Sequence, residues 1–312
     1  VGIVYEIGER ASKEIEVYGN ELKVGDRVTW APCAPCGKCK YCKLLPLRQG
    51  ARYCPNTISI GKCTEPPYFI MCGFCEYSFL PSKAWVFKLP NEMSDEEAVL
   101  IEPLACVLSG IEKAMTPEPY LKQGFGIGDN IVIQGAGVMG ILAATIVKAL
   151  GAKIIIMIGA PEWRLKLAEE FGVTHVINID IIKKPQDRIE NVMKITKGWG
   201  ADLVIECTGN PLAIPEGIEM VRRGGVYLQI GVFRGKTEIS IDPYKLCYRE
   251  LRWISQWGNS PLDFERGYHF MLTFKNNFPF KKLITHRFKL EEVGQALEIS
   301  EKLECLKAVI LP

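Results

Sequence analysis

The chain has 312 residues, of which 48% are hydrophobic and 24% are charged, and its formal net charge is +2 at pH 7. This length is sufficient for two domains, each with its own core. The nearly balanced charge argues against a protein that binds nucleic acid or a membrane surface by electrostatic attraction, and the composition is that of an ordinary globular protein.

Short predicted strands with Gly, Pro and Asp turns between them occupy the N-terminal third. They lie at residues 2–7, 27–30, 74–80 and 85–89. Such strands at close spacing predict a small β-barrel or sandwich. The first of them starts one residue after Val1, in what should be the middle of a sheet, so we expect further residues upstream.

Four cysteines with the spacing of metal ligands interrupt this region: Cys36, Cys39, Cys42 and Cys54. Four thiolates can surround one tetrahedral zinc ion and leave no coordination position open. The pattern therefore predicts a structural zinc site rather than a reactive one. The alternative is a set of free thiols in a turn-rich loop, which the repeated spacing makes the weaker interpretation.

Three other cysteines leave the ligand set open. Cys33 competes with Cys36 for a place in the quartet, whereas Cys72 and Cys75 lack two further partners nearby and are expected to be core thiols. Because the cysteines crowd into one segment at metal-binding spacing, reduced thiols in a cytoplasmic protein are favoured over a secreted disulfide scaffold.

From residue 130 the pattern changes to alternating strands and helices. Strands are expected at 131–134, 154–158, 175–179, 203–206 and 226–230, and helices at about 138–150 and 161–171. Apolar strands that show no period-two alternation predict a parallel sheet covered by helices on both faces. After about residue 257 the pattern is mixed again, with a closing helix predicted at 290–302 and a last strand at 308–311.

A glycine fingerprint, Gly135, Gly137 and Gly140, directly follows the strand at 131–134 and opens the next helix. At such a turn the backbone amides and the helix N-terminus can receive the pyrophosphate of a dinucleotide. The alternative is a membrane span, because residues 130–147 carry no charge. Three glycines at fingerprint spacing argue against a span.

The residue expected to hold the adenosine ribose is unusual. An acidic residue is typical about twenty positions after the glycines, and this chain has Gly159 there. The missing carboxylate removes a repulsion that would exclude a 2′-phosphate, and Arg164, one helical turn further, can offer positive charge to either cofactor. The alternative for Arg164 is a solvated helix residue. The choice between NAD and NADP therefore stays open.

Several segments, taken together and in order, resemble the zinc-containing medium-chain dehydrogenases/reductases. They are residues 2–8, 24–28, 36–54, 102–105, 135–140, 206–209 and 283–288. The resemblance covers essentially the whole chain. It is specific for the superfamily and not for the substrate.

This resemblance implies an α/β fold in which a Rossmann doubly wound parallel sheet, residues 106–257, is inserted in a GroES-like β-barrel catalytic domain. The catalytic domain would comprise residues 1–105 and 258–312, with the zinc lobe at about 33–54 and an incomplete N-terminus. The active site would lie between the domains. The residues implied to bind the cofactor, NAD or NADP, are Gly135, Gly137, Val138, Met139, Gly140, Gly159, Arg164, Thr208, Gly231 and Val232.

The resemblance also implies a second, catalytic zinc that acts as a Lewis acid on the alcohol oxygen. Glu102 matches one of its ligands, in a Glu-Pro-Leu form similar to that of polyol and threonine dehydrogenases. Apolar runs flank Glu102 and predict its burial, and the alternative role is an ion-paired carboxylate. The other ligands would lie upstream of Val1, so this chain by itself is expected to hold that zinc poorly and to be inactive.

The function that follows is hydride transfer between a secondary alcohol or polyol and NAD(P). The alternative is a zinc-free, quinone-reductase-like or cofactor-binding protein of the same superfamily. We assign no catalytic role to His175, His269 or His286. Expected partners are the small alcohol or ketone and further copies of the chain, joined through residues 251–256 as a dimer or tetramer, with no nucleic acid and no membrane. Loops near Tyr68 and Phe69 are expected to line the substrate pocket.

Overall fold

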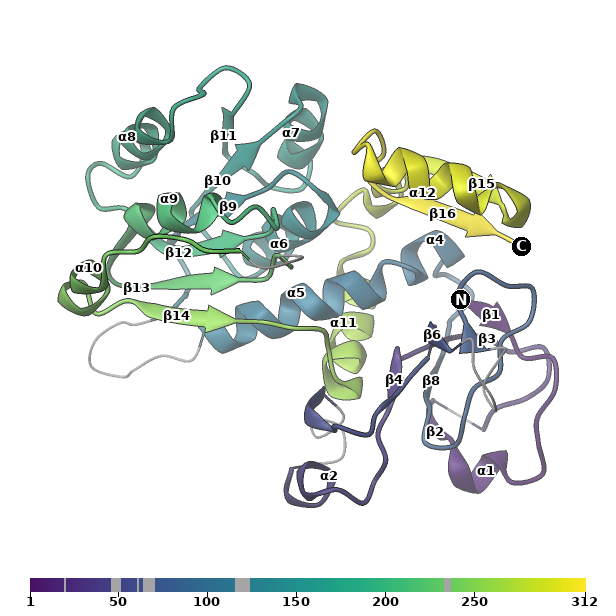
Figure 1. Ribbon diagram of the computed structural model, residues 1–312. Coiled ribbons are helices and arrows are strands. Elements are labelled where there is room, and N and C mark those ends of the chain that lie inside the picture. Colours follow the sequence, from purple (N-terminus) through teal and green to yellow (C-terminus); the bar gives the residue numbers. More distant parts are fainter. Residues whose placement is uncertain (20, 46–51, 61, 64–70, 116–123, 233–236) are drawn as a thin grey trace. The chain divides into compact units, whose positions relative to one another are not determined.

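The computed structural model (Figure 1) describes residues 1–19, 21–45, 52–60, 62–63, 71–115, 124–232 and 237–312. The chain divides into two compact units: unit 1 is Val1–Ala105 with Gly258–Pro312, and unit 2 is Cys106–Trp257. Among the described residues, no helix combines the length and the apolar character that a membrane crossing needs. The expected contribution of Tyr68 and Phe69 to a substrate pocket lies outside the described residues.

Unit 2 is built on a six-stranded sheet with the order β11-β10-β9-β12-β13-β14, in which every neighbouring pair is parallel. Its strands are β9 (Asn130–Gln134), β10 (Ile154–Gly159), β11 (His175–Asn178), β12 (Ala201–Glu206), β13 (Val221–Gln229) and β14 (Arg252–Ser255). The chain runs outward from β9 in one direction and then returns to add β12 on the other side. The parallel, doubly wound sheet predicted from the apolar strands is thus confirmed.

Helices cover both faces of this sheet. They are α5 (Ile101–Ala114), which begins in unit 1, α6 (Val138–Ala149), α7 (Glu162–Glu169), α8 (Pro185–Ile195), α9 (Ala213–Met220) and α10 (Pro243–Tyr248). Val132 of β9 is fully buried in a cluster with Ile214 and Ile218 of α9, whereas Ile133 faces α6 at Gly140. Burial of each Ile or Val side chain stabilises the fold by about 1.5–3 kcal/mol. Because helices cover both faces, residues on both faces of the strands are apolar.

Helix α7 shows how local sequence sets one of these elements. The side chains of Leu165, Ala168 and Phe171 are at most 2% exposed, as their helical spacing predicts. The helix ends before Gly172, whose φ of +95° suits glycine. Arg164 in the same helix is only 7% exposed, so the interpretation of this residue as a solvated helix residue is wrong.

Unit 1 contains a four-stranded sheet with the order β1-β3-β8-β2 and three smaller pairs of strands. The large sheet comprises β1 (Gly2–Ile3), β2 (Glu16–Tyr18), β3 (Arg27–Trp30) and β8 (Trp85–Lys88). The pairs are β4 (Cys33–Ala34) with β5 (Ile58–Ser59), β6 (Lys62–Cys63) with β7 (Met71–Cys72), and β15 (His286–Lys289) with β16 (Ala308–Leu311). The helices are α1 (Ala11–Glu14), α2 (Lys40–Leu44), α4 (Asp95–Ala98), α11 (Pro261–Phe274), α12 (Val293–Glu301) and the 3-10 turns η1 (Phe280–Leu283) and η2 (Leu290–Glu292).

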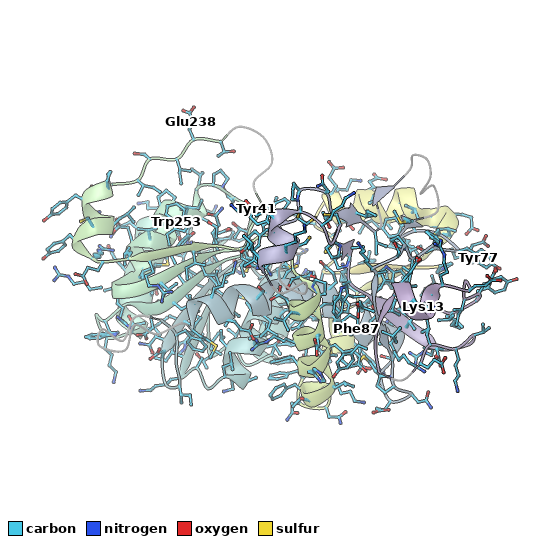
Figure 2. The ribbon with its side chains drawn as sticks, turned by 90° about the horizontal axis from the view of Figure 1, so that it is seen from below. Lys13, Tyr41, Tyr77, Phe87, Glu238 and Trp253 are labelled. Carbon is cyan, nitrogen blue, oxygen red and sulfur yellow. The ribbon has the colours of Figure 1, made fainter. Side chains whose placement is uncertain are left out.

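An aromatic cluster joins the two sequence segments of unit 1. Phe87 of β8, labelled in Figure 2, is fully buried. Its ring centroid lies 4.9 Å from that of Phe264 and 5.9 Å from that of Tyr268, both in α11. The Tyr268 hydroxyl donates a hydrogen bond to the Lys88 carbonyl over 2.8 Å. Because each aromatic pair adds about 0.5–1.5 kcal/mol to simple burial, this contact fixes α11 on the sheet.

Two strand predictions in unit 1 are wrong. The first strand covers only Gly2–Ile3, not residues 2–7, and Tyr5 beyond it is 72% exposed. Residues 74–80 form no strand. Phe74 and Tyr77 there are 56% and 61% exposed, so their aromatic character does not mark a buried sheet face. Figure 2 shows the Tyr77 side chain projecting away from the ribbon. The closing helix also differs, because residues 290–292 form a separate 3-10 turn.

Candidate cofactor pocket and metal centre

The glycine fingerprint lies at the turn from β9 to α6, at the carboxyl end of the sheet. A Cβ on Gly140 would come within 1.9 Å of the Gly135 carbonyl oxygen, and one on Gly135 would come within 3.1 Å of the Cys207 carbonyl group. Gly135 also has a φ of +109°, which L side chains rarely adopt. A Cβ on Gly137 would meet no atom within 4 Å. Gly137 therefore faces open space at the N-terminus of α6, where a pyrophosphate would be received.

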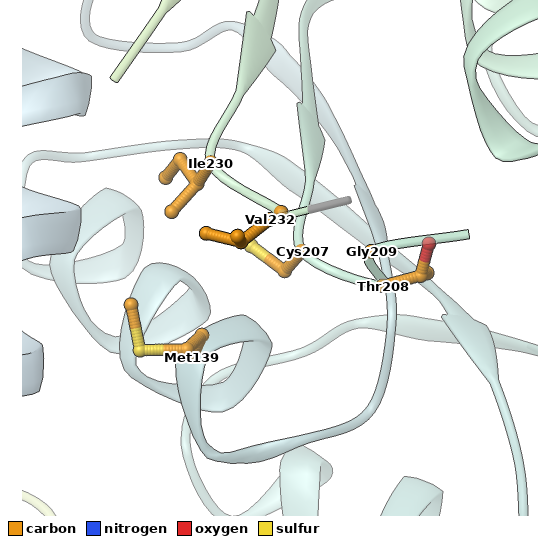
Figure 3. Close-up of a pocket in the computed structure, with 7 residues that line it drawn as sticks. Met139, Cys207, Thr208, Gly209, Ile230 and Val232 are labelled. Carbon is orange, nitrogen blue, oxygen red and sulfur yellow. The ribbon is translucent and has the colours of Figure 1, made fainter. Parts of the chain in front are cut away.

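A cavity of about 200 Å³ lies beside this turn (Figure 3). It is lined by Met139, Cys207, Thr208, Gly209, Ile230, Gly231 and Val232. These residues come from the start of α6 and from the segments that follow β12 and β13. Because the strand order reverses between β9 and β12, the cavity lies at the switch point of the sheet, the position at which doubly wound folds bind nucleotides.

The floor of the cavity is held by a buried carboxylate. Glu206, the last residue of β12, is 0% exposed. Its Oε1 accepts hydrogen bonds from the Thr208 amide over 2.6 Å, the Thr208 hydroxyl over 2.5 Å and the Gly209 amide over 3.0 Å. Its backbone carbonyl accepts the amides of Ile230 and Gly231. One residue thus joins two segments that line the cavity.

Burial and the charge of Glu206 together act on neighbouring groups. Burial first, and this charge second, raise the pKa of the Cys207 thiol well above its usual value. The same two causes, in the same order, raise the pKa of the Tyr227 phenol. Both groups are therefore neutral at physiological pH.

The predicted ribose position is crowded as well as uncharged. A Cβ on Gly159 would come within 2.7 Å of the Ala136 Cβ and 2.8 Å of the Ala136 amide nitrogen. A side chain at position 159 would therefore require the glycine turn to move. The guanidinium of Arg164 lies 5.3 Å from the centre of the Trp163 ring, which fixes a cation at the start of α7.

The four predicted zinc ligands come together in unit 1. The Sγ atoms of Cys36, Cys39, Cys42 and Cys54 all lie within 4.8 Å of one another. The Sγ of Cys39 is 3.5 Å from that of Cys42 and 3.8 Å from that of Cys54, close to the sulfur separation of about 3.8 Å in a tetrahedral site with Zn–S bonds of about 2.3 Å. The donor set and its spacing therefore fit a zinc ion.

Local backbone structure places these thiols. Gly37 adopts a φ of +72°, and helix α2 starts after Cys39 and puts Cys42 inside. Hydrogen bonds from the amides of Lys38 and Cys39 lower the pKa of Cys36 to about 6, whereas burial raises the pKa of Cys42 to about 12. An ionised thiol at Cys36 would be a ready ligand for a zinc ion.

The other cysteines differ in their surroundings. Cys33 lies in β4 outside the cluster, and burial raises the pKa of its thiol to about 11. Cys75 is partly exposed, so the prediction of a core thiol does not hold for it. Cys72 lies in β7, and its side chain is outside the described residues.

Glu102 lies in the first turn of α5, and its carboxylate accepts a hydrogen bond from the Asn259 side-chain amide over 2.9 Å. Its neighbours Ile101 and Leu104 are fully buried, but Glu102 itself is partly exposed. The predicted burial of Glu102 is therefore only partial.

The three histidines lie apart from any metal-binding group in the described residues. His269 accepts or donates a hydrogen bond at the Tyr18 hydroxyl over 2.6 Å, and His286 lies 3.0 Å from the Thr285 hydroxyl. His175 is exposed and lies 2.9 Å from the Thr174 hydroxyl. These contacts do not test the prediction that none of the three is catalytic.

Sequence reasoning missed the roles of Glu206, Cys207 and Asn259. Glu206 ends an apolar strand next to a Thr-Gly turn, and that position was a usable signal, because a charge at the end of a buried strand needs donors. Asn259 comes close to Glu102 only through the packing of segments distant in sequence. No local pattern marks it.

Comparisons with known proteins agree with this architecture. Residues 138–273 match the family model for zinc-binding dehydrogenase. A sorbitol dehydrogenase of Bacillus subtilis is 31% identical over 315 residues, which cover 98% of this chain and 80% of the relative. An alcohol dehydrogenase structure from Thermotoga maritima superposes with a TM-score of 0.82 at 31% identity, over 93% of this chain and 77% of that one. A zinc-binding dehydrogenase structure from Sinorhizobium meliloti, bound to NADP, gives a TM-score of 0.82 at 25% identity, over 100% and 81%. The chain belongs to the zinc-containing medium-chain dehydrogenase/reductase family.

Proposed function

We propose that this protein is a zinc-dependent oxidoreductase that transfers hydride between a secondary alcohol or polyol and NAD(P). The observation that carries the proposal is the cavity at the switch point of unit 2, which adjoins a glycine turn open at Gly137. A tetrathiolate cluster in the same chain disfavours the zinc-free, quinone-reductase-like alternative. The family relationship supports the same class of reaction.

The proposed cofactor site has one part for the pyrophosphate and one for the nicotinamide. The pyrophosphate would bind the amides of Gly137, Val138 and Met139 at the start of α6, and the nicotinamide would enter the cavity beside Thr208 and its neighbours Gly231 and Val232. When bound, the cofactor supplies the hydride acceptor. The apolar lining from Met139, Cys207 and Ile230 would exclude water from that ring.

The ribose half does not by itself decide between NAD and NADP. Gly159 offers no carboxylate to repel a 2′-phosphate, and the crowding against Ala136 keeps a larger side chain out. Arg164 would place its positive charge on this side of the site. The structural relative bound to NADP supports acceptance of the phosphorylated form. We propose that both cofactors are accepted.

The quartet Cys36, Cys39, Cys42 and Cys54 would bind one structural zinc ion. Four thiolates leave no position for substrate, so this ion contributes to folding of the lobe and not to the reaction. Glu102 would lie at or beside a second zinc, which supplies a Lewis acid for the alcohol oxygen when bound. The hydrogen bond from Asn259 would orient the Glu102 carboxylate for that role.

We further propose that copies of the chain associate through strand β14. This strand is the last in the sheet order, and it pairs with β13 on one side only. Trp253 on it is 38% exposed. An edge strand of this kind is commonly covered by a second copy across a two-fold axis. The cysteine quartet at metal-ligand spacing suits a protein of a reducing, cytoplasmic location.

A substrate panel tests the proposed function. Protein produced from its complete reading frame, loaded with zinc, is mixed with NAD or NADP and with sorbitol, D-xylulose, L-threonine or simple secondary alcohols and ketones, and nicotinamide absorbance is followed. We expect turnover with at least one alcohol or ketone and its loss after zinc removal. Turnover of a quinone without zinc, and of no alcohol, would establish the alternative.

A further inference from the structure

The described residues that line the cavity include no acidic or basic side chain, yet a buried carboxylate lies directly behind them. Both carboxylate oxygens of Glu206 lie inside the protein, since the residue is 0% exposed. Oε1 takes three hydrogen bonds from Thr208 and Gly209, and Oε2 is buried without a hydrogen-bond partner. Such an oxygen keeps its negative charge unscreened by a donor.

The second oxygen, Oε2, lies beside Gly231, one of the residues that line the cavity. A Cβ on Gly231 would come within 2.2 Å of Glu206 Oε2 and 2.6 Å of the Gly209 amide nitrogen. Thr208, Gly209 and Gly231 all line the cavity. The carboxylate is therefore hydrogen-bonded to two of the lining residues, Thr208 and Gly209, and lies beside a third, Gly231. Figure 3 labels Thr208 and Gly209 on one of the lining segments, and Ile230 and Val232 on the other.

The three donors on Oε1 indicate the ionised form of this carboxylate. An ionised carboxyl group offers only acceptors, and two amides and one hydroxyl aimed at a single oxygen suit that form. In that form Glu206 contributes a negative potential to the cavity.

We propose that Glu206 is a positioning residue that also makes the cavity discriminate between the redox forms of the cofactor, favouring the oxidised nicotinamide. The inference rests on the proposed function, because it needs the nicotinamide ring in this cavity. The oxidised ring carries a positive charge and the reduced ring is neutral. A buried anion behind the lining stabilises the first and not the second, so it favours the enzyme form that is ready to oxidise an alcohol.

The test measures dissociation constants of the oxidised and the reduced cofactor by calorimetry or by quenching of protein fluorescence, with no turnover involved. Glu206→Gln keeps an oxygen for the three donors and removes the charge. We expect it to weaken binding of the oxidised form relative to the reduced form by about tenfold, the size expected for a charge pair at a partly buried distance. Glu219→Gln is the matched control, because Glu219 pairs with Lys245 and Arg249 at the other side of α9, and its ratio should equal that of the wild type.

Thr208→Val separates positioning from charge. It removes one of the three donors but leaves the carboxylate, so both cofactor forms should bind more weakly while their ratio stays within about twofold. If Glu206→Gln does not fold, Glu206→Asp replaces it. Aspartate keeps the charge but draws it back from the loop, so both affinities fall, and a weaker preference for the oxidised form is expected.

The outcomes are distinct. Equal weakening of both forms by Glu206→Gln, or wild-type affinities for both, overturns the inference. So does a Glu206→Asp protein that keeps wild-type affinity for both forms. If the wild-type protein binds neither form, the proposed function itself fails, and that result is separate from any change in the ratio.

Discussion

A single methyl group distinguishes the roles of the two glycines at the start of α6. Position 137 has room for a Cβ, but that room faces the predicted pyrophosphate, whereas a Cβ at position 140 would collide with the Gly135 carbonyl. Gly137→Ala should therefore leave the free energy of unfolding nearly unchanged and weaken cofactor binding at least about tenfold. Gly140→Ala should lower the melting temperature itself.

Thermal unfolding with and without cofactor checks this prediction. The wild type should gain stability from the cofactor by mass action, and Gly137→Ala should not. Gly294→Ala is a suitable control, because a Cβ there also meets nothing within 4 Å and the position lies in α12. A Gly137→Ala protein stabilised as strongly as the wild type would contradict the assignment of the pyrophosphate site.

Glu102 is the residue on which the catalytic-zinc proposal depends. In protein from the complete reading frame, Glu102→Ala should lower kcat/KM by at least about a hundredfold, the size typical when a metal ligand or its immediate support is lost. Asn259→Ala should lower it less, because the carboxylate would remain but lose its orienting hydrogen bond. Zinc content and kinetics of both variants measure the effect, and unchanged kcat/KM in Glu102→Ala would refute the assignment.

Residue patterns in the sequence were enough to find the zinc quartet and the glycine turn, because each motif is local and its spacing is set by one metal ion or one helix start. For Glu206 the local signal was present, because its donors Thr208 and Gly209 follow it directly. Patterns were insufficient for Asn259, whose partner Glu102 in the first turn of α5 is far away in sequence. Burial of Glu102 was overestimated because flanking apolar residues do not fix the direction of one side chain.

At the scale of elements, the described residues of the zinc lobe form little apolar core of their own. Ala34, Ile60 and Ala84 form a small buried cluster there, and the strands β4 and β5 each have two residues. A bound zinc ion would therefore supply much of the stability of the lobe. Chelation, or Cys42→Ser, should increase proteolysis within residues 33–60 while unit 2 stays intact.

Limited proteolysis followed by mass spectrometry locates those cuts. Cys247→Ser is the control, because Cys247 is an exposed thiol in α10 and outside the cluster. Cleavage that begins equally in both units after chelation, or a lobe unaffected by zinc loss, would contradict the structural role.

Helices α8 and α9 are joined by a buried ion pair. The guanidinium of Arg188 donates to both carboxylate oxygens of Glu216 over 2.7 and 2.6 Å, and both side chains are about one-tenth exposed. Removal of one partner from a buried pair costs about 3–5 kcal/mol, because the other charge is left uncompensated. Glu216→Gln should thus lower the free energy of unfolding by about 3 kcal/mol, measured in urea.

Double substitution separates the pair from simple packing. Arg188→Met with Glu216→Leu removes both charges and should recover most of the lost stability. If the double variant is less stable than Glu216→Gln alone, the hydrogen bonds from Arg188 to the carbonyls of Ile182 and Lys183 carry more of the stability than the ion pair does.

Most strands of unit 2 and the helices α6 and α7 were predicted to within a few residues, because a parallel strand buried on both faces has a long apolar run; β13 starts earlier than predicted, at Val221. Unit 1 was harder to predict. Its strands are two to four residues long, too short for alternation to be read, and exposed aromatics such as Phe74 imitate a strand pattern.

At the scale of the whole molecule, one chain of the zinc-containing medium-chain dehydrogenase/reductase family combines a doubly wound sheet in unit 2 with a cysteine quartet in unit 1. The order of the motifs along the sequence was informative, since a cysteine lobe followed by a glycine turn is specific for this family. The substrate was beyond prediction, because a substrate pocket depends on loops whose side chains are selected for shape and not for a repeating pattern.

Direct transfer of hydrogen from the alcohol carbon to the nicotinamide is the central chemical claim. The best alcohol from the substrate panel is prepared with deuterium on its carbinol carbon and turned over by zinc-loaded protein from the complete reading frame, and the reduced cofactor is analysed by mass spectrometry. We predict one deuterium atom in each reduced cofactor molecule and slower turnover than with the unlabelled alcohol. Reduced cofactor without deuterium, or a protein that binds cofactor and zinc and still reduces none, would contradict the claim.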